Sequence, residues 1–205
     1  MQGLSSLKLR RGKVPLNAYE GSDETMLTLQ KLLSIVQNER GKELKQHILD
    51  LYEDDREKVT HALNTIFWHG DTYSTMLIAY ISRDEPSVED IQMLVNDLGA
   101  NPALWTTPTG KYNDSMDTVN ALLLAAQWRK KDIVQFLASK SKGVNLHGKM
   151  DVSIQHLEPR VQQSIKAAYH KGIMNHTHRS VRRRSAPQLV HSRRRSQKTR
   201  RLSQR

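Results

Sequence analysis

The sequence of 205 residues contains no cysteine. This absence excludes disulfide scaffolds, thiolate metal sites and cysteine nucleophiles, and it leaves the redox compartment open because a chain without thiols suits any of them. Long apolar runs are also missing, since the longest strongly apolar run is the six residues at 121–126. A membrane-spanning helix needs roughly 20, and the opening segment MQGLSSLKLRRGKV has no apolar stretch of signal-peptide length. We therefore expect a soluble chain that has no transmembrane segment and is not secreted through a signal peptide.

Acidic residues are missing from one long segment. Residues 179–205 hold eleven Lys and Arg and no Asp or Glu, which equals the whole formal charge of +11. Four basic residues (Lys8, Arg10, Arg11 and Lys13) precede the first carboxylate, so residues 14–178 carry 17 basic and 21 acidic residues. Apolar residues make up 37% of the chain, below the roughly 45–50% of globular domains. These observations indicate a mildly acidic body between a flexible basic arm at 1–21 and a disordered basic tail at 173–205.

The rest of the chain has helical periodicity and lacks the sustained alternation of strands, so the sequence predicts an all-α fold. Residues 22–70 predict three N-terminal helices. Ser22, Asp23 and Glu24 supply a capping hydroxyl and first-turn charge for the first, and the second covers about residues 42–52. The acidic pair Asp54 and Asp55 starts the third. Its expected apolar face consists of Val59, Leu63, Ile66 and Phe67, and Gly70 is its expected end.

Two later segments resemble each other. The first reads STMLIAY at 74–80 and VEDIQMLVNDLGAN at 88–101, and the second reads NALLLAA at 120–126 and KKDIVQFLASK at 130–140. Each predicts a helix of small apolar residues, a polar turn, and a second helix with apolar residues at i, i+3 and i+4. Over about residues 71–145 this pattern resembles the ankyrin repeat.

The resemblance is carried by residues at matching positions. In the second segment these are Leu124, Ala125, Ala126, Asp132, Ile133, Val134, Phe136 and Leu137; in the first they are Met76, Ile78, Ala79, Ile91, Leu94, Val95, Gly99, Ala100 and Asn101. The family's Thr-Pro-Leu-His motif is replaced by STML at 74–77 and NALL at 120–123. Matching Ala79 to Ala125 gives a spacing of 46 residues, against the usual repeat of about 33. We expect the extra residues at about 82–87 and 102–118.

The resemblance implies a short α-solenoid of stacked helix pairs whose concave face binds other proteins, with no catalytic activity and no cofactor. On this interpretation residues 22–70 form an N-terminal cap or degenerate repeats, and residues 71–150 form the ankyrin-like repeats. Residues 151–172 then provide a C-terminal capping helix that closes the stack. Pro159 marks the start of this helix and Gly172 marks its end.

The segment inserted at 102–117 lengthens one finger of such a stack, and it carries Trp105, Lys111 and Tyr112. Large aromatic and basic side chains on a loop favour contacts with a partner protein. The alternative is that Trp105 folds back as a small satellite core. A second candidate contact set stands at the turn between the paired helices: Trp128, Arg129 and Lys130. These residues border the same groove or form a solvated ridge.

The arginine clusters of the tail indicate an acidic partner; they are Arg182, Arg183, Arg184, Arg193, Arg194, Arg195, Arg200 and Arg201. Three interpretations are open: a nuclear import signal read by an import receptor, a nucleic-acid arm, and a patch for anionic membrane. The tail has no aromatic residue for base stacking, and we favour import. Ser185, Ser196 and Ser203 follow arginines at spacings that basophilic kinases accept, and phosphorylation there would cancel local positive charge.

Catalytic motifs are not found in the sequence. It has no phosphate-binding glycine loop, metalloprotease motif or nucleophile elbow, and His170, His176 and His178 are expected to be surface histidines because no nearby carboxylate completes a metal site. The sequence thus predicts a non-enzymatic, protein-binding adaptor of the nucleus or cytoplasm that needs no metal. Two alternatives stay open. One is a nucleic-acid-associated protein that binds phosphates through the tail, and the other is a bacterial effector that binds a host protein inside a eukaryotic cell.

Overall fold

The computed structural model describes residues 23–69, 72–107, 118–141 and 146–185. These residues form nine α-helices and one two-stranded hairpin. In chain order the elements are α1 (Asp23–Asn38), α2 (Gly41–Leu51), α3 (Arg56–Leu63), β1 (Phe67–His69), β2 (Thr72–Ser74), α4 (Met76–Ile81), α5 (Val88–Asn96), α6 (Ala121–Gln127), α7 (Lys131–Lys140), α8 (His147–Ile154) and α9 (Pro159–Ser185). The described part is mostly helical, which agrees with the predicted all-α class.

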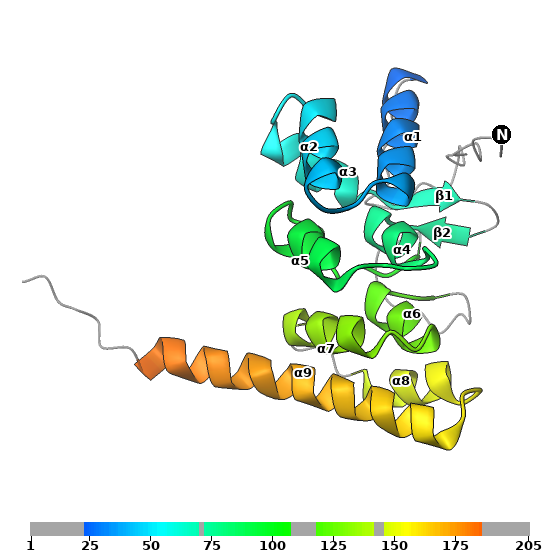
Figure 1. Cartoon of the computed structure of the whole chain (residues 1–205), viewed down its shortest axis with the longest axis vertical. Helices are drawn as coiled ribbons and strands as arrows, with labels where there is room; N and C mark the ends of the chain where they lie inside the picture. The colour runs from blue at the N-terminus through cyan, green and yellow to red at the C-terminus, as the bar shows by residue number, and fades with distance from the viewer. Residues whose placement is uncertain (1–22, 70–71, 108–117, 142–145, 186–205) are drawn as a thin grey trace, which may run out of the picture.

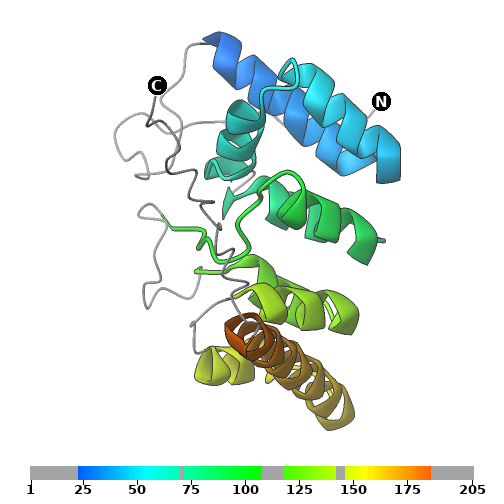
Figure 2. The same ribbon diagram turned by 90° about the vertical axis from the view of Figure 1, so that its left-hand side faces the viewer.

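The helices stack in two rows (Figure 1). The inner row consists of α1, α4, α6 and α8, and the outer row consists of α2, α5, α7 and α9, with α3 beside α2. Neighbours within each row are in contact, and α1 packs against α2, α4 against α5, and α6 against α7. Figure 2 shows the same order along the molecule after a quarter turn. Consecutive helix pairs therefore lie side by side.

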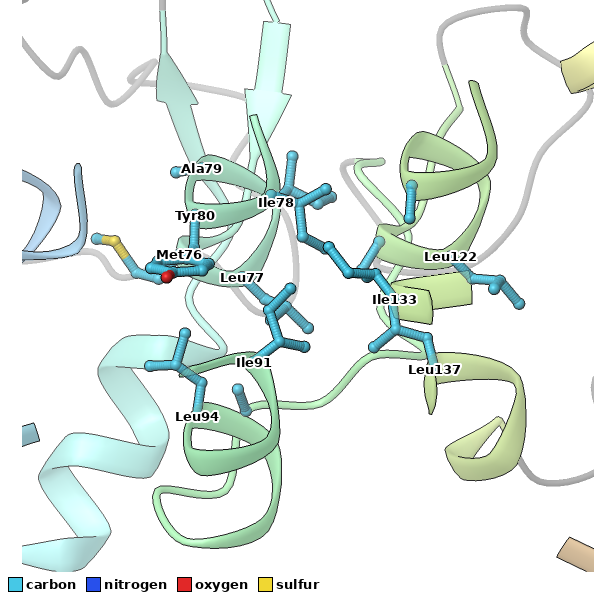
Figure 3. Packing of buried hydrophobic residues seen from close by; sticks show 14 of the residues in the cluster. Met76, Leu77, Ile78, Ala79, Tyr80, Ile91, Leu94, Leu122, Ile133 and Leu137 are labelled. Atoms are coloured by element: carbon cyan, nitrogen blue, oxygen red, sulfur yellow. The ribbon is translucent and has the colours of Figure 1, made fainter. Parts of the chain in front are cut away.

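One continuous core lies between the two rows, and every helix contributes to it. Figure 3 shows its middle, formed by Met76, Leu77 and Tyr80 of α4, Ile91 and Leu94 of α5, Leu122 of α6, and Ile133 and Leu137 of α7. None of these side chains is more than 2% exposed. Because burial stabilises by roughly 25 cal/mol per Å² of apolar surface, this shared core holds the helix pairs together.

Side-chain caps fix the positions at which several helices begin. Thr75 at the start of α4 and Asn120 at the start of α6 each accept a hydrogen bond from the backbone N–H three residues later, at 3.3 and 2.9 Å. Before α3, Oδ1 of Asp55 accepts from the N–H groups of Glu57 and Lys58, each at 3.1 Å. The bond from the Lys58 backbone is the main cause that lowers the pKa of Asp55. The predicted start at the acidic pair 54–55 is confirmed.

The third helix is shorter than expected. It ends at Leu63, and the next residue, Asn64, is held by the turn after α5. Its Nδ2 donates to the carbonyl of Gly99 at 2.9 Å, and its Oδ1 accepts from the N–H of Asn101 at 2.7 Å. Residues 66–67, which were expected on the helix, are fully buried but lie outside it. A tertiary contact therefore ends α3 before the apolar pattern does.

A short hairpin stands where the sequence predicted the end of a helix. β1 pairs with β2 in antiparallel register, with Phe67 opposite Ser74, Trp68 opposite Tyr73, and His69 opposite Thr72. The prediction that strands are absent is wrong here, because a three-residue strand is too short to show alternation over the four to eight residues that such a pattern needs. Gly70, the predicted helix end, lies outside the described residues.

The last helix is longer than expected. It continues to Ser185, so Gly172 lies inside α9, and the predicted boundary between capping helix and tail falls within one element. A Cβ on Gly172 would lie 2.3 Å from the carbonyl oxygen of Gln135 and 2.7 Å from the Cβ of Ala138. The glycine is thus explained by the close approach of α9 to α7 and not by a helix end.

The helix α8 was not predicted, and it crosses the domain boundary expected at 150/151. It occupies the inner row below α6, while α9 packs along α7 in the outer row (Figure 1). The buried side of α9 includes Ile165 and Tyr169. Within residues 159–175 its exposed residues are Pro159, Arg160, Gln163, Ser164, Ala167, His170, Lys171, Met174 and Asn175. A mainly polar outer face is what the last element of a stack requires.

Candidate binding groove

A groove of about 920 Å³ crosses the inner row. Its described lining comes from the end of α1 (Gln37), from the residue before α2 (Arg40), from β2 (Thr72, Tyr73, Ser74), from α4 and the turn after it (Ile78, Ala79, Ser82, Arg83, Asp84, Glu85), from the extended residues Thr106 and Val119, and from α6 (Leu124, Gln127). Three consecutive inner helices and the extended segments beside them therefore share one concave surface.

The extended wall of the groove is held by a reciprocal pairing. The N–H of Thr106 donates to the carbonyl of Val119 at 2.8 Å, and the N–H of Val119 donates back to the hydroxyl of Thr106 at 3.2 Å. Next to this pair, Trp105 and Asn120 form an isolated antiparallel bridge. Asn120 also caps α6, so the extended wall and the inner helix are fixed to one another.

Basic side chains connect the ends of successive inner helices. Nη1 of Arg83, just after α4, donates to the carbonyl oxygens of Val36 and Glu39 at the end of α1, at 3.1 and 2.5 Å. Nζ of Lys130, just after α6, donates to the carbonyl oxygen of Asp84 at 3.1 Å. Cations near helix ends satisfy carbonyls that have no partner within the helix. Each inner helix thus reaches back to its predecessor along the edge of the groove.

Some charged side chains of the groove have a partner within the protein and others do not. The guanidinium of Arg83 also lies 4.9 Å from the centre of the Tyr80 ring, and Arg40 pairs with Glu85 at 3.5 Å across two exposed side chains. Among the described residues, no side chain bonds to the carboxylate of Asp84, whose backbone oxygen alone is used. Asp84 is exposed. Within that part of the chain the carboxylate of Asp84 is therefore unpaired, whereas that of Glu85 is paired with Arg40.

A buried polar network lies behind the groove. The hydroxyl of Tyr80 donates to Oδ2 of Asp90 at 2.6 Å and accepts from the N–H of Ser87 at 3.3 Å. Oδ1 of Asp90 accepts from the N–H of Gly41 at 2.9 Å. Burial, followed by the hydrogen bond to Asp90, raises the pKa of Tyr80 to about 12. The network joins α4 and α5 to the first residue of α2.

Sequence reasoning missed this network. If α4 and α6 are aligned at their capping residues, Thr75 and Asn120, then Tyr80 aligns with Ala125. The sequence alone matched Ala125 with Ala79. Aligning the buried residues of α5 with those of α7 likewise places Asp90 opposite Ile133. A tyrosine and an aspartate therefore replace an alanine and an isoleucine. The available signal was an acidic residue on the apolar face of residues 88–96.

Trp105 is not an exposed contact residue. Its side chain is only 7% exposed and belongs to the main core, and Nζ of Lys149 on α8 lies 5.8 Å from the centre of its ring. The alternative interpretation is correct in that the ring folds back, but the ring joins the main core and not a small satellite core. The bridge to Asn120 brings the start of the inserted segment against the stack. Lys111 and Tyr112 lie outside the described residues.

The turn between α6 and α7 is only partly exposed. Trp128 is 43% exposed and Arg129 is also exposed, with a left-handed backbone at φ 61°. Lys130 instead makes the structural bond to Asp84. None of the three is among the described residues that line the groove, which at this end is lined by Gln127. These residues follow the groove-lining Gln127 in the chain but do not line the groove themselves.

The predicted tail residues fall into two groups. The backbone positions of Arg182, Arg183, Arg184 and Ser185 lie at the end of α9. The other predicted tail residues lie outside the described part of the chain: Arg193, Arg194, Arg195, Ser196, Arg200, Arg201 and Ser203. The first basic cluster therefore continues the helix that closes the stack.

Within the described ranges, no three His, Asp or Glu side chains come together as they would around a metal ion. No helix there is long and apolar enough to cross a bilayer. No protein-family model matches the chain, and neither a curated protein nor a solved structure matches it.

Proposed function

We propose that this protein is a protein-binding adaptor and that the groove across the inner row is its contact surface. The observation that carries the proposal is the lining of the groove, which comes from three stacked helices and two extended segments. A ligand seated there would touch several helix pairs at once. Such a surface is suited to an elongated partner, because contacts accumulate along the stack and do not converge on one deep point.

The resemblance to ankyrin repeats supports the same function. In that family, extended fingers and inner helices form a concave surface that binds other proteins. In this chain the pairs α4–α5 and α6–α7 each consist of an inner and an outer helix, and each follows an extended segment. We therefore propose an ankyrin-like α-solenoid in which α1 and α2 occupy the first position and α8 and α9 the last. We propose no catalytic residue.

The test is affinity purification of partners with the full chain and two matched variants. Ser82→Trp places a large ring in the groove at an exposed position, and Ser164→Trp places the same ring on the exposed face of α9. We expect the wild type and Ser164→Trp to capture the same discrete proteins and Ser82→Trp to lose them, with unchanged circular dichroism. Equal capture by all three proteins would reject the groove as the contact surface.

We further propose that the basic tail directs the protein to the nucleus, with Arg182–Arg184, Arg193–Arg195 and Arg200–Arg201 as the residues that an import receptor would bind. The alternative is that the tail binds nucleic acid through phosphates. The observation that favours this alternative is the charge of residues 179–205, which contain eleven basic residues and no acidic one. Such a segment binds polyanions with an affinity that falls steeply with salt.

A further inference from the structure

We infer that the groove binds an extended segment of a partner protein that carries a lysine or arginine, and that the carboxylate of Asp84 recognises this cation. The inference rests on the proposed function and names the chemistry of its ligand. Three properties of the groove support it: its length, its unpaired amides and its free carboxylate.

The length of the groove suits a short extended peptide. Its lining begins on α1, crosses α4 and ends on α6, which are successive neighbours in the inner row. Packed helices lie about 8–10 Å apart, so the crossing spans roughly 16–20 Å. An extended chain advances about 3.3 Å per residue. The groove therefore accommodates about five or six residues that run across the inner helices.

The two ends of the groove carry side-chain amides. Gln37 lies on α1 and Gln127 on α6, and within the described part of the chain no hydrogen bond or ion pair is made by either side chain. A glutamine amide presents one acceptor and two donors, which match the N–H and C=O groups of a peptide unit. Between them, Ser82 is exposed and its hydroxyl, although it donates to the carbonyl of Ile78, can still accept. These groups can hold a peptide backbone without regard to its side chains.

The charge of the groove selects a cationic residue. Arg83 is directed at the carbonyls of α1 and at the ring of Tyr80, and Arg40 is paired with Glu85. The carboxylate of Asp84 has no side-chain partner among the described residues, and Lys130 bonds to its backbone oxygen and not to its carboxylate. An acidic ligand residue would face this carboxylate, while lysine or arginine would pair with it. Glu85 can join this pairing because its own bond to Arg40 is long and exposed.

The experiment selects random heptapeptides displayed on phage against the full-length chain. We expect the wild type to select peptides with lysine or arginine at one fixed position. Asp84→Lys should select aspartate or glutamate at that position. The control is Asp132→Lys, the same charge reversal at an exposed residue of α7 that does not line the groove, and it should keep the wild-type preference. A synthetic peptide of one selected sequence should bind Asp84→Asn about two- to fivefold more weakly, the scale of an exposed ion pair. This difference should shrink at high salt.

The possible failures are distinguishable. Peptides whose binding is blocked by Ser82→Trp but which show no cationic preference would overturn the role of Asp84 and leave the proposed function standing. Peptides insensitive to Ser82→Trp would overturn both. A chain that lacks residues 186–205 should bind the peptide with unchanged affinity. Markedly tighter binding after this removal would show that the chain's own basic tail occupies the groove, and it would overturn the proposal of a partner segment.

Discussion

The hydroxyl of Tyr80 donates a hydrogen bond of 2.6 Å to the carboxylate of Asp90, and both side chains are buried, at 0% and 4% exposure. The second carboxylate oxygen accepts from the N–H of Gly41 at 2.9 Å. Asp90 therefore connects its own helix pair to the start of α2 in the preceding pair. Because a buried carboxylate is costly unless its oxygens are bonded, the two contacts depend on one another.

Replacement of Tyr80 by phenylalanine should destabilise the protein without a large change in packing. The variant keeps the ring but leaves Oδ2 of Asp90 without the hydroxyl that donates to it. An unsatisfied buried acceptor costs about 1–3 kcal/mol, so the free energy of unfolding of Tyr80→Phe should fall by about that amount. Urea denaturation followed by circular dichroism measures it. A loss well below 0.5 kcal/mol would show that water or a shifted side chain replaces the hydroxyl.

The same hydroxyl predicts a dependence of stability on alkaline pH. Burial and the bond to Asp90 raise the pKa of Tyr80 from 10.0 to about 12. Between these values the unfolded chain releases the proton while the folded chain retains it, so stability falls as the pH rises from about 10 to 12 and is unaffected below about 10. The slope from one proton is at most about 1.4 kcal/mol per pH unit. In Tyr80→Phe this part of the slope should disappear from unfolding curves measured at pH 9, 10 and 11. A wild type and a variant with parallel profiles would contradict the assignment.

The acidic residues at 54–55 predicted where α3 begins, but local sequence signals did not predict the polar network. Asp55, Thr75 and Asn120 each cap a helix through bonds that span two or three residues, and such short-range patterns can be recognised in a sequence. The partners Tyr80, Asp90 and Gly41 come together only after two helix pairs have stacked. The sequence therefore predicted the mostly helical class and much of the pairing. It did not predict that a tyrosine and an aspartate replace an apolar contact.

Helix ends were harder to predict than helix starts, and glycine shows the reason. Gly172 fits the pattern of a helix terminator, yet it is an interior residue at which α9 approaches α7. The end of α3 is fixed by Asn64, which bonds to the carbonyl of Gly99 in the turn after α5, in a different helix pair. Both cases depend on a distant backbone, which periodicity does not report. The sequence likewise predicted a concave binding face but not the residues that line the groove, because they come from separate elements between α1 and α6.

Two of the helical glycines, Gly172 and Gly148, predict opposite effects of the same substitution. In Gly172→Ala the new Cβ would lie 2.3 Å from a backbone oxygen of α7, so the helices must separate. Such overpacking costs typically about 1–3 kcal/mol. In Gly148→Ala the new Cβ would meet nothing within 4 Å, and alanine should stabilise α8 by about 0.5–1 kcal/mol. Thermal unfolding of both variants provides the comparison. Equal shifts of the same sign would show that α9 does not pack on α7 as described.

The two tryptophans Trp105 and Trp128 should also respond differently to alanine. Trp105 is 7% exposed and part of the core, and Trp128 is 43% exposed at the turn after α6. Truncation of a buried tryptophan costs about 3–5 kcal/mol, whereas an exposed one should change stability by about 0.5 kcal/mol or less. Partner capture is therefore informative only for Trp128→Ala, which stays folded. A stable Trp105→Ala variant would contradict the burial of this ring.

The tail hypothesis predicts a change of location. The deletion that tests it shortens α9 at its end, at residues 179–185, and keeps the α9 residues that belong to the core, Ile165 and Tyr169. In animal cells, a fluorescent fusion of the full chain should concentrate in the nucleus, and removal of residues 179–205 should abolish this concentration. The alternative predicts instead that nucleic-acid affinity falls steeply with salt, with a slope of about −0.9 per phosphate contact on a log–log plot.

Replacement of Arg193, Arg194 and Arg195 by lysine separates general charge from arginine-specific contacts, because lysine keeps the charge but not the bidentate geometry. We expect the lysine variant to retain nuclear accumulation and the triple alanine variant to lose most of it. Unchanged distribution of the shortened chain, together with tail-dependent and salt-sensitive DNA binding, would replace the import hypothesis with the nucleic-acid alternative.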